Sequence, residues 1–354
     1  MSKKILMTGG GTAGHVTPNI ALFPYLKKAG YEILYVGSYD GIEKKLVEEQ
    51  GIAYKGISSG KLRRYFSLKN FTDPFRVIKG FGEAKKIIKE YKPDVVFSKG
   101  GFVSVPIVFA ANKYKVSTII HESDITPGLA NKLSIPKATK VCHNFPETAE
   151  YLPKEKAVLT GCAIRDELLA GDKLAGLDFC GFTANKPVVM VIGGSLGALA
   201  VNNMVREALP ELLKKYQVVH LCGRGKLDES YKGTEGYVQF EYIEGELKNL
   251  FAMADVVISR AGANAICELQ ALAKPNILIP LPSASSRGDQ ALNAASFEKQ
   301  GFSVVLQEET LTKEKLAETV NNVFENKNTY IENMKKSSQN NAIETIMGLI
   351  ENIG

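Results

Sequence analysis

Two glycine-rich turns, each placed directly after an apolar run, constrain the fold of this chain most. The first follows residues 4–8 and reads Gly-Gly-Gly-Thr-Ala-Gly-His at 9–15; the second follows residues 187–192 and reads Gly-Gly-Ser-Leu-Gly at 193–197. A buried strand, a glycine turn and a helix N-terminus together form an anion site, because glycine lets the backbone approach closely and free N–H groups point outward. The repeat therefore predicts two similar domains, each able to hold phosphate groups.

Short apolar runs alternate with helical patterns along both halves of the chain. The helical patterns include 82–91, 202–216 and 293–300. The predicted strands are 4–8, 32–36, 94–97, 116–120 and 140–143 in the first half, and 188–192, 217–221, 237–240, 256–258, 276–279 and 303–306 in the second. This alternation is typical of parallel sheets, and 354 residues suit two such cores. The predicted fold class is α/β, with two Rossmann-like doubly wound parallel-sheet domains.

The predicted domains are 1–163 and 164–336, with a linker over about 161–186. The last helix is predicted at about 342–352, and the C-terminal segment 337–354 is expected to pack back onto the first domain. Ligands of open α/β sheets bind beyond the carboxyl ends of the strands. We therefore expect the active site in a cleft between the two domains.

Composition narrows the class of protein. Five scattered cysteines without a CxxC pair indicate a reducing compartment and argue against a disulfide framework or a zinc site. The four histidines include no pair with metal-ligand spacing. The chain starts with Met1 and runs directly into a strand, so no signal peptide is predicted, and no apolar run is long enough to predict a membrane span.

Basic residues are concentrated in the first half. Residues 1–163 carry 25 Lys and Arg against 14 Asp and Glu, a balance of +11, whereas the remainder has a balance of −5. Ten of the basic residues fall between Lys61 and Lys92, where four phenylalanines are interleaved. Such a stretch suits an anionic membrane surface. The alternatives are nucleic acid and a solvated helix whose aromatic side chains reach the core.

Residues 9–14 also fit the G-x-G-x-x-G pattern of dinucleotide-binding folds. That fingerprint expects an acidic residue at the end of the second strand to hold the ribose. Here the strand ends in Gly37-Ser38 and Asp40 falls beyond it. The pattern therefore disfavours nicotinamide or flavin binding, and no cofactor is predicted.

Polar residues in the first half follow predicted strand ends. His15 comes at the end of the glycine turn, and a histidine of near-neutral pKa suits a general base; the alternative is a helix-start histidine bonded to the backbone. The segment His121-Glu122-Ser123-Asp124 follows another strand. It indicates a site, an N-cap of the next helix provided by Ser123 or Asp124, or both together.

In the second half, small residues between Arg260 and Glu268 would allow close approach of a ligand. Glu268 suits a ribose diol, and Asp289 and Gln290 suit sugar hydroxyls. The alternatives are a solvated helix carboxylate for Glu268 and helix capping for the other two.

Taken in order, several segments resemble the MurG family, the peripheral membrane N-acetylglucosaminyltransferases of peptidoglycan synthesis. The resemblance covers nearly the whole chain, and the combination is specific although each piece alone is not. The segments are Gly-Thr-Ala-Gly-His at 11–15, Gly-Gly-Phe-Val at 100–103, His121-Glu122, Pro-Gly-Leu-Ala-Asn at 127–131, Gly-Gly-Ser at 193–195 with Asn202, residues 260–268, and Asp289-Gln290 with Asn293.

The resemblance implies a GT-B fold, inversion at the anomeric carbon and no catalytic metal. Family members move GlcNAc from UDP-GlcNAc to undecaprenyl-diphospho-MurNAc-pentapeptide. The implied partners are therefore this donor, the lipid-diphosphate acceptor and the anionic inner leaflet, at the cytoplasmic face of the bacterial membrane, and not nucleic acid.

The resemblance also implies roles for individual residues. His15 and Glu122 take catalytic positions, Ser195 touches the nucleotide phosphate and Ile243 the uracil. Implied donor contacts are Thr12, Ala13, Gly14, Arg165, Ser195, Ile243, Asn264, Glu268, Asp289 and Gln290. Implied contacts to the acceptor and its diphosphate are Gly11, Gly14, Phe102, His121 and Asn131. Implied supporting residues are Asn202, Arg260, Asn293 and Asp124.

The chain departs from the family pattern in a few places. Ala13 stands where glycine is common, Phe102 where tyrosine is common, and Asp289 where glutamine is frequent. Ser123-Asp124 replaces Gln-Asn, and the Asp124 carboxylate would repel a diphosphate unless it is paired or protonated. Three other functions stay open: a transferase using another lipid acceptor such as diacylglycerol, a non-catalytic module that binds sugar nucleotides, and, as the weakest, a nicotinamide dehydrogenase.

Overall fold

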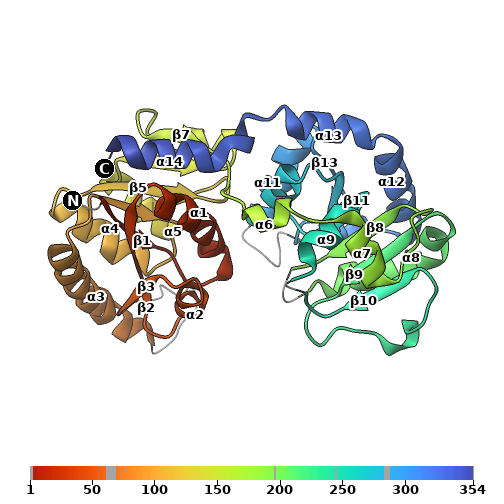
Figure 1. Cartoon of the computed structure of the whole chain (residues 1–354), viewed down its shortest axis with the longest axis horizontal. Helices are drawn as coiled ribbons and strands as arrows, with labels where there is room; N and C mark the ends of the chain where they lie inside the picture. The colour runs from red at the N-terminus through yellow and green to blue at the C-terminus, as the bar shows by residue number, and fades with distance from the viewer. Residues whose placement is uncertain (1–2, 61–68, 195–196, 244, 283–287, 354) are drawn as a thin grey trace. The chain divides into compact units, whose positions relative to one another are not determined.

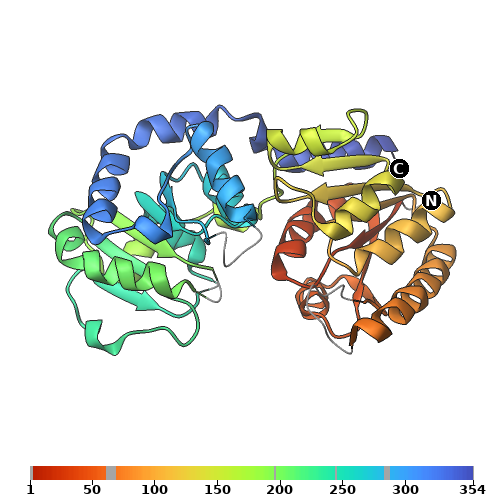
Figure 2. The same cartoon turned by 180° about the vertical axis from the view of Figure 1, so that it is seen from behind.

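The computed structural model describes residues 3–60, 69–194, 197–243, 245–282 and 288–353. The chain divides into two compact units. The first unit comprises Met1–Arg165 and Asn341–Gly354, and the second comprises Asp166–Asn340. Each unit is a parallel sheet with helices on both faces (Figures 1 and 2).

The sheet of the first unit has the strand order β3-β2-β1-β4-β5-β6-β7. Its strands are β1 (Lys3–Thr8), β2 (Tyr31–Ser38), β3 (Ala53–Ile57), β4 (Val95–Ser98), β5 (Ser117–Glu122), β6 (Lys140–His143) and β7 (Ala157–Leu159). Its helices are α1 (Thr17–Lys28), α2 (Ile42–Glu48), α3 (Lys69–Tyr91), α4 (Ser104–Lys113), α5 (Leu129–Ser134) and α14 (Ala342–Ile353). Ile5 of β1 pairs with Ile33 on one side and Val95 on the other. These central strands are apolar because helices cover both of their faces.

The C-terminal helix α14 belongs to the first unit (Figure 1). Its apolar residues Ile346 and Ile350 are four apart, so they lie on the same face of the helix. Both are buried in a cluster with Ile5 of β1 and Leu22 and Leu26 of α1. Fully burying one such side chain stabilises the unit by about 1.5–3 kcal/mol, which explains why the chain returns to this sheet.

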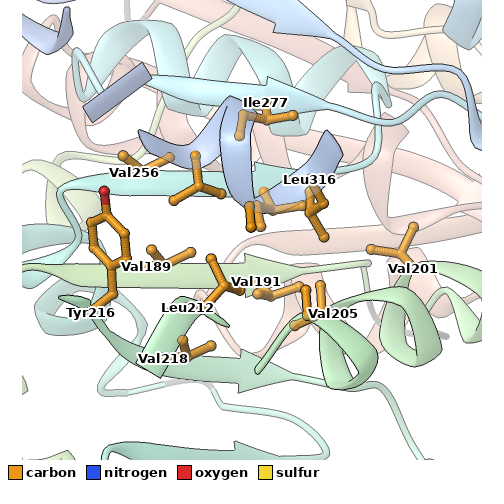
Figure 3. Packing of buried hydrophobic residues seen from close by; sticks show 14 of the residues in the cluster. Val189, Val191, Val201, Val205, Leu212, Tyr216, Val218, Val256, Ile277 and Leu316 are labelled. Atoms are coloured by element: carbon orange, nitrogen blue, oxygen red, sulfur yellow. The ribbon is translucent and has the colours of Figure 1, made fainter. Parts of the chain in front are cut away.

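The sheet of the second unit has the order β10-β9-β8-β11-β12-β13. Its strands are β8 (Val188–Ile192), β9 (Gln217–Leu221), β10 (Tyr237–Phe240), β11 (Val256–Ser259), β12 (Asn276–Leu278) and β13 (Ser303–Val305). Its helices are α6 (Asp166–Leu169), α7 (Lys173–Cys180), α8 (Leu199–Lys215), α9 (Leu247–Met253), α10 (Ala263–Ala271), α11 (Asp289–Lys299), α12 (Lys313–Glu325) and α13 (Lys327–Lys335). Figure 3 shows Val189 and Val191 of β8 packed with Val205 of α8 and Leu316 of α12.

The structure adds two strands that were not predicted and replaces the predicted linker. The strands β3 and β7 lie at the two edges of the first sheet and were not predicted, because Ala53–Ile57 contains Lys55 and Gly56 and β7 has only three residues. The predicted linker at 161–186 holds α6 and α7 instead. Asp172 caps α7 by accepting from the Ala175 N–H at 2.8 Å, and a methyl at Gly176 would clash with the Asn249 carbonyl, so α7 packs tightly on α9.

In both sheets the strand order reverses beside the glycine turn. Strands β1 and β8 are followed by the two turns, and their neighbours β4 and β11 begin the second half of each order. Ligands of doubly wound folds bind at the carboxyl ends of the strands at this reversal point. None of the helices in the described ranges has both the length and the apolar character needed to cross a membrane.

Candidate active site

The first glycine turn is packed more closely than the sequence predicts. The Gly10 N–H donates to the Gly100 carbonyl at 3.3 Å, and the Gly11 N–H donates to Glu43 Oε2 at 3.2 Å. The expectation of free N–H groups is therefore wrong for these two glycines. The amides of Thr12 and Ala13, at the start of the short helix η1 (Ala13–His15), make no hydrogen bond to any described residue.

Glu43 is a buried carboxylate that the sequence analysis missed. Its Oε1 accepts from the Ser38 N–H at 2.9 Å and from Ser38 Oγ at 2.5 Å. A methyl added at Gly10 would lie 2.6 Å from Glu43 Cδ, and one at Gly37 would lie 2.7 Å from Glu43 Cγ. The glycines therefore leave room for this side chain, which ties the turn to the end of β2. The sequence offered one signal for this carboxylate: Glu43 is an acidic residue in the first turn of the helix that follows Gly41.

The ring of His15 is hydrogen-bonded to the backbone of the glycine turn, as the alternative interpretation predicts, and one ring nitrogen stays available. Its Nδ1 lies 3.0 Å from the Gly10 carbonyl oxygen, which can only accept a hydrogen bond. Nδ1 therefore carries the proton of the neutral ring and Nε2 carries the lone pair. Burial, followed by the positive charge of Lys99, lowers the pKa of His15, while the Gly10 carbonyl, Asp124 and Glu43 oppose this shift. The ring is thus held neutral with its basic nitrogen available.

Glu122, at the end of β5, organises a turn. Its Oε1 accepts from the N–H groups of Ser123 and Asp124 at 2.8 and 3.1 Å. Its Oε2 accepts from the Gly128 N–H at 3.0 Å and from Asn131 Nδ2 at 2.8 Å. Burial is the main cause that raises the pKa of Glu122. With four donors satisfied, this carboxylate orients the turn.

The N-cap interpretation of Ser123 and Asp124 is wrong. Helix α5 begins at Leu129, and its N-cap residue is Gly128. Ser123 Oγ instead accepts from Lys99 Nζ at 2.8 Å. Both Ser123 and Asp124 are partly buried in the turn that Glu122 holds.

His121 and Lys99 form a buried pair under this turn. His121 Nε2 lies 2.9 Å from the Gly161 carbonyl oxygen, and Nδ1 lies 2.6 Å from Lys99 Nζ. Since a carbonyl only accepts, Nε2 carries the proton and Nδ1 accepts from the ammonium. Burial, then the Lys99 charge, places the pKa of His121 well below its usual value. Both ring nitrogens are occupied, so His121 is not positioned to take a proton.

The glycine pair after β4 lies against the first glycine turn. Gly100 and Gly101 have φ values of +92° and +84°, and a methyl at Gly101 would clash with the Gly10 carbonyl. A methyl at Gly100 would lie 3.2 Å from Asn131 Oδ1. Phe102 follows and is partly buried. The predicted residues His15, Glu122, His121 and Asn131 are thus gathered at the carboxyl edge of the first sheet.

The second glycine turn has a buried polar support. A methyl at Gly197 would clash with the Cys222 carbonyl, which also accepts from Asn202 Nδ2 at 2.8 Å. Asn202 Oδ1 lies 3.0 Å from Nε2 of the buried His220. Asn202 therefore links this turn to β9, consistent with a supporting role. Ser195 lies outside the described residues.

The other predicted residues of the second unit lie around α10 and α11. Arg260 pairs with Glu308 and donates from Nη1 to the carbonyls of Ile279 and Pro280 at 3.0 and 3.1 Å. Gln290 Oε1 accepts from the Leu281 N–H at 3.1 Å. Asn293 is fully buried and donates to the Ala261 carbonyl at 3.4 Å. The partly buried members are Asn264 and Glu268 on α10, Asp289 at the start of α11, and Ile243 in the loop before α9.

Arg165 is the last residue of the first unit, and its Nε is buried without a hydrogen-bond partner among the described residues. Within the described residues, no three His, Cys, Asp or Glu side chains are grouped so that they could share a metal ion.

Comparison with known proteins identifies the family. Residues 5–143 match the glycosyltransferase family 28 N-terminal domain, and residues 188–348 match the glycosyltransferase family 28 C-terminal domain. The chain belongs to glycosyltransferase family 28. It is a glycosyltransferase with the GT-B fold of two parallel-sheet domains.

Its relatives extend over the whole chain. It is 66% identical over 351 residues to the UDP-N-acetylglucosamine--N-acetylmuramyl-(pentapeptide) pyrophosphoryl-undecaprenol N-acetylglucosamine transferase of Lachnoclostridium phytofermentans, covering 99% of both chains. It is 63% identical to the Lachnospira eligens protein of the same name, again over 99% of both. The crystal structure of Acinetobacter baumannii MurG matches with a TM-score of 0.79 and 26% identity over 99% of both chains. The predicted MurG resemblance is confirmed.

Proposed function

We propose that this family 28 glycosyltransferase moves GlcNAc from UDP-GlcNAc to the C4 hydroxyl of undecaprenyl-diphospho-MurNAc-pentapeptide, with inversion at the anomeric carbon. The names of relatives that are 59–66% identical over 99% of the chain support this donor and acceptor. The site observation that carries the proposal is the neutral His15, whose Nε2 lone pair is free of any hydrogen bond to the described residues.

The chemistry needs a base because an alcohol is a poor nucleophile while it keeps its proton. The acceptor oxygen attacks the anomeric carbon and forms the new glycosidic bond. The bond from that carbon to the UDP phosphate oxygen breaks, and its electron pair leaves with UDP. The hydroxyl proton passes to His15 Nε2. Glu122 orients the neighbouring turn through its four hydrogen bonds and is a positioning residue in this scheme.

The second unit is assigned the donor. Glu268 would accept from the ribose hydroxyls, while Asp289 and Gln290 would bind the GlcNAc hydroxyls. Backbone N–H groups of the turn at 193–197, together with Arg165, would stabilise the charge that develops on UDP. The buried Nε of Arg165, unpaired within the described residues, supports an anionic ligand there. The scheme uses no metal ion.

The first unit is assigned the acceptor. Thr12 and Ala13, which the family resemblance implies as donor contacts, have amides that make no hydrogen bond to the described residues, and in this scheme they would face the diphosphate of the acceptor instead. The basic segment between Lys61 and Lys92 would dock on the anionic inner leaflet, placing the enzyme at the cytoplasmic face of the membrane. Its residues 61–68 lie outside the described part of the chain. Flotation with anionic liposomes at low and high salt tests the docking: salt-insensitive binding, or no binding at low salt, would contradict it.

The test of the reaction is transfer of radiolabelled GlcNAc from UDP-GlcNAc to a short-chain lipid I analogue, with and without EDTA. We expect product in both conditions. Product that disappears with EDTA would refute the metal-free scheme, and bound UDP-GlcNAc without any product would point to another acceptor or to a binding module.

Two variants separate the roles of the units. His15→Ala should lower kcat by roughly 10²–10⁴ and leave the UDP dissociation constant unchanged. Glu268→Ala should weaken UDP binding, whereas Glu318→Ala, an exposed carboxylate on α12, should not. Unchanged turnover in the first variant, or unchanged UDP affinity in the second, would remove that residue from its role.

A further inference from the structure

Lys99 is a buried cation that the proposed mechanism does not use. It directly follows β4, and only 1% of the residue is exposed. No carboxylate oxygen of a described residue lies within ion-pair distance of its Nζ. Burying a charge without an opposite charge is costly. Such a side chain is therefore a candidate for a role in the site.

The ammonium is held by two neutral groups. Nζ donates to His121 Nδ1 at 2.6 Å and to Ser123 Oγ at 2.8 Å. His121 is fixed in turn by the Gly161 carbonyl at 2.9 Å from Nε2. This chain of contacts locks the lysine in one position and connects it to the turn that carries Asp124.

Lys99 also lies against the glycine turn that carries His15. The Lys99 N–H donates to the Thr8 carbonyl at 2.9 Å, directly before the turn. A methyl at Gly9 would lie 2.5 Å from the His15 carbonyl oxygen and 3.2 Å from Lys99 Cβ. Gly9 thus lies between the backbone of His15 and Cβ of Lys99.

We propose that Lys99 is a positioning residue of this active site, whose buried ammonium fixes the Ser123-Asp124 turn and places a positive charge near His15. The inference rests on the proposed function of His15 as the base.

The charges around His15 act in opposite directions. Lys99, on the loop after β4, favours the neutral ring. Asp124, on the loop after β5, and Glu43, on α2, favour the protonated ring, as does the Gly10 carbonyl. Removing the Lys99 charge removes one of the two causes that lower the pKa of His15, so this pKa should rise. Since the base works in its neutral form, the acidic limb of the rate profile must move to higher pH.

The experiment uses the full-length enzyme with Lys99→Met, which removes the charge, and Lys99→Gln, which removes the charge but keeps a hydrogen-bond donor. Lys140→Met is the matched control, because Lys140 is the first residue of β6, at the amino end of a strand two positions from β4 in the same sheet, and its Nζ donates to the Glu155 carbonyl. The pKa of His15 is read from histidine NMR signals of the free enzyme, which has only four histidines. The second readout is kcat/KM against pH in the lipid I assay.

We expect both neutral variants to raise the pKa of His15 and the acidic limb together, by at least about half a pH unit. Lys140→Met should change neither, and Lys99→Arg should restore most of the wild-type profile. The melting temperature of Lys99→Met should fall, since the hydrogen bonds from Nζ to His121 and Ser123 are lost, so the pKa of His15 is the readout that decides. A merely structural role would lower the melting temperature and leave the pKa of His15 unchanged, and that result would overturn the proposal.

The two proposals fail in different ways. If the wild-type enzyme transfers no GlcNAc, the proposed function fails whatever the NMR titration shows. If the wild type is active and Lys99→Gln keeps the wild-type pKa of His15 and the wild-type pH profile, the role of Lys99 fails and the transferase stands.

Discussion

Gly101→Ala is the sharpest test of how the two glycine loops of the first unit hold each other. Gly101 has φ +84°, and a methyl there would clash with the Gly10 carbonyl. The same carbonyl accepts from His15 Nδ1 at 3.0 Å. The substitution therefore pushes on the atom that fixes the ring of the proposed base.

The expected loss in the free energy of unfolding has two parts. A side chain in the left-handed region costs about 1–2 kcal/mol, and overpacking a closed contact costs about 1–3 kcal/mol more. The free energy of unfolding should fall by about 2–5 kcal/mol, a large part of the ~5–15 kcal/mol typical of a domain. A shift of about 1 Å in a catalytic group can lower a rate about 100-fold, so kcat should fall by at least about tenfold.

Gly11→Ala is the matched control. Gly11 has φ +88°, but a methyl there would meet no atom of the described residues within 4 Å. It should cost only the backbone part, about 1–2 kcal/mol. Urea unfolding gives the difference in stability, and initial rates in the lipid I assay give kcat. Equal stability losses in the two variants, or an unchanged kcat in Gly101→Ala, would refute the reasoning.

Three further predictions concern buried groups. Glu43→Gln should lower the free energy of unfolding by about 2–3 kcal/mol, since an amide cannot accept all the hydrogen bonds from Ser38 and Gly11. The control is Glu49→Gln, because Glu49 is exposed. Equal urea midpoints for the two variants would contradict the prediction. Burial lowers the pKa of His220 to about 3. Between that pH and about 6.5, His220 is therefore protonated in the unfolded chain and neutral in the folded protein. The free energy of unfolding should fall by about 1.4 kcal/mol per pH unit on acidification within this window. His220→Gln should flatten that slope in urea titrations, and an unchanged slope would count against the assignment. All five cysteines are buried, so Ellman's reagent at pH 8 should label the native protein slowly and the urea-unfolded chain fast; rapid native labelling would show that a thiol is accessible.

The fold was predictable because its signals are local. Alternating apolar and helical segments specify parallel sheets, and a glycine turn after a strand specifies where each ligand edge lies. The central strands β1, β4, β5, β8 and β9 were found near their predicted positions because helices cover both of their faces. The edge strand Ala53–Ile57 and the helices between Asp166 and Cys180 were missed. Their apolar patterns are short, and packing against α9 and the sheet decides their structure.

The residues of the candidate site were predictable from the sequence, but their contacts were not. His15, His121, Glu122 and Asn131 were found because each follows a strand or a glycine turn in the sequence. Their individual roles could not be predicted, because these depend on contacts between residues that are far apart in the sequence. The contact of Lys99 with His121 spans 22 residues, and that of Glu43 with Gly11 spans 32.

The sequence by itself determined two glycine-turn α/β domains and the family to which they belong, because periodicity and glycine placement are properties of the chain alone. Only the tertiary structure decided which nitrogen of His15 is basic, why His121 cannot be the base, and where a buried ammonium stands beside them. Tautomers and pKa values depend on which acceptors and charges lie within a few ångströms, and those neighbours come from different strands of the folded sheet.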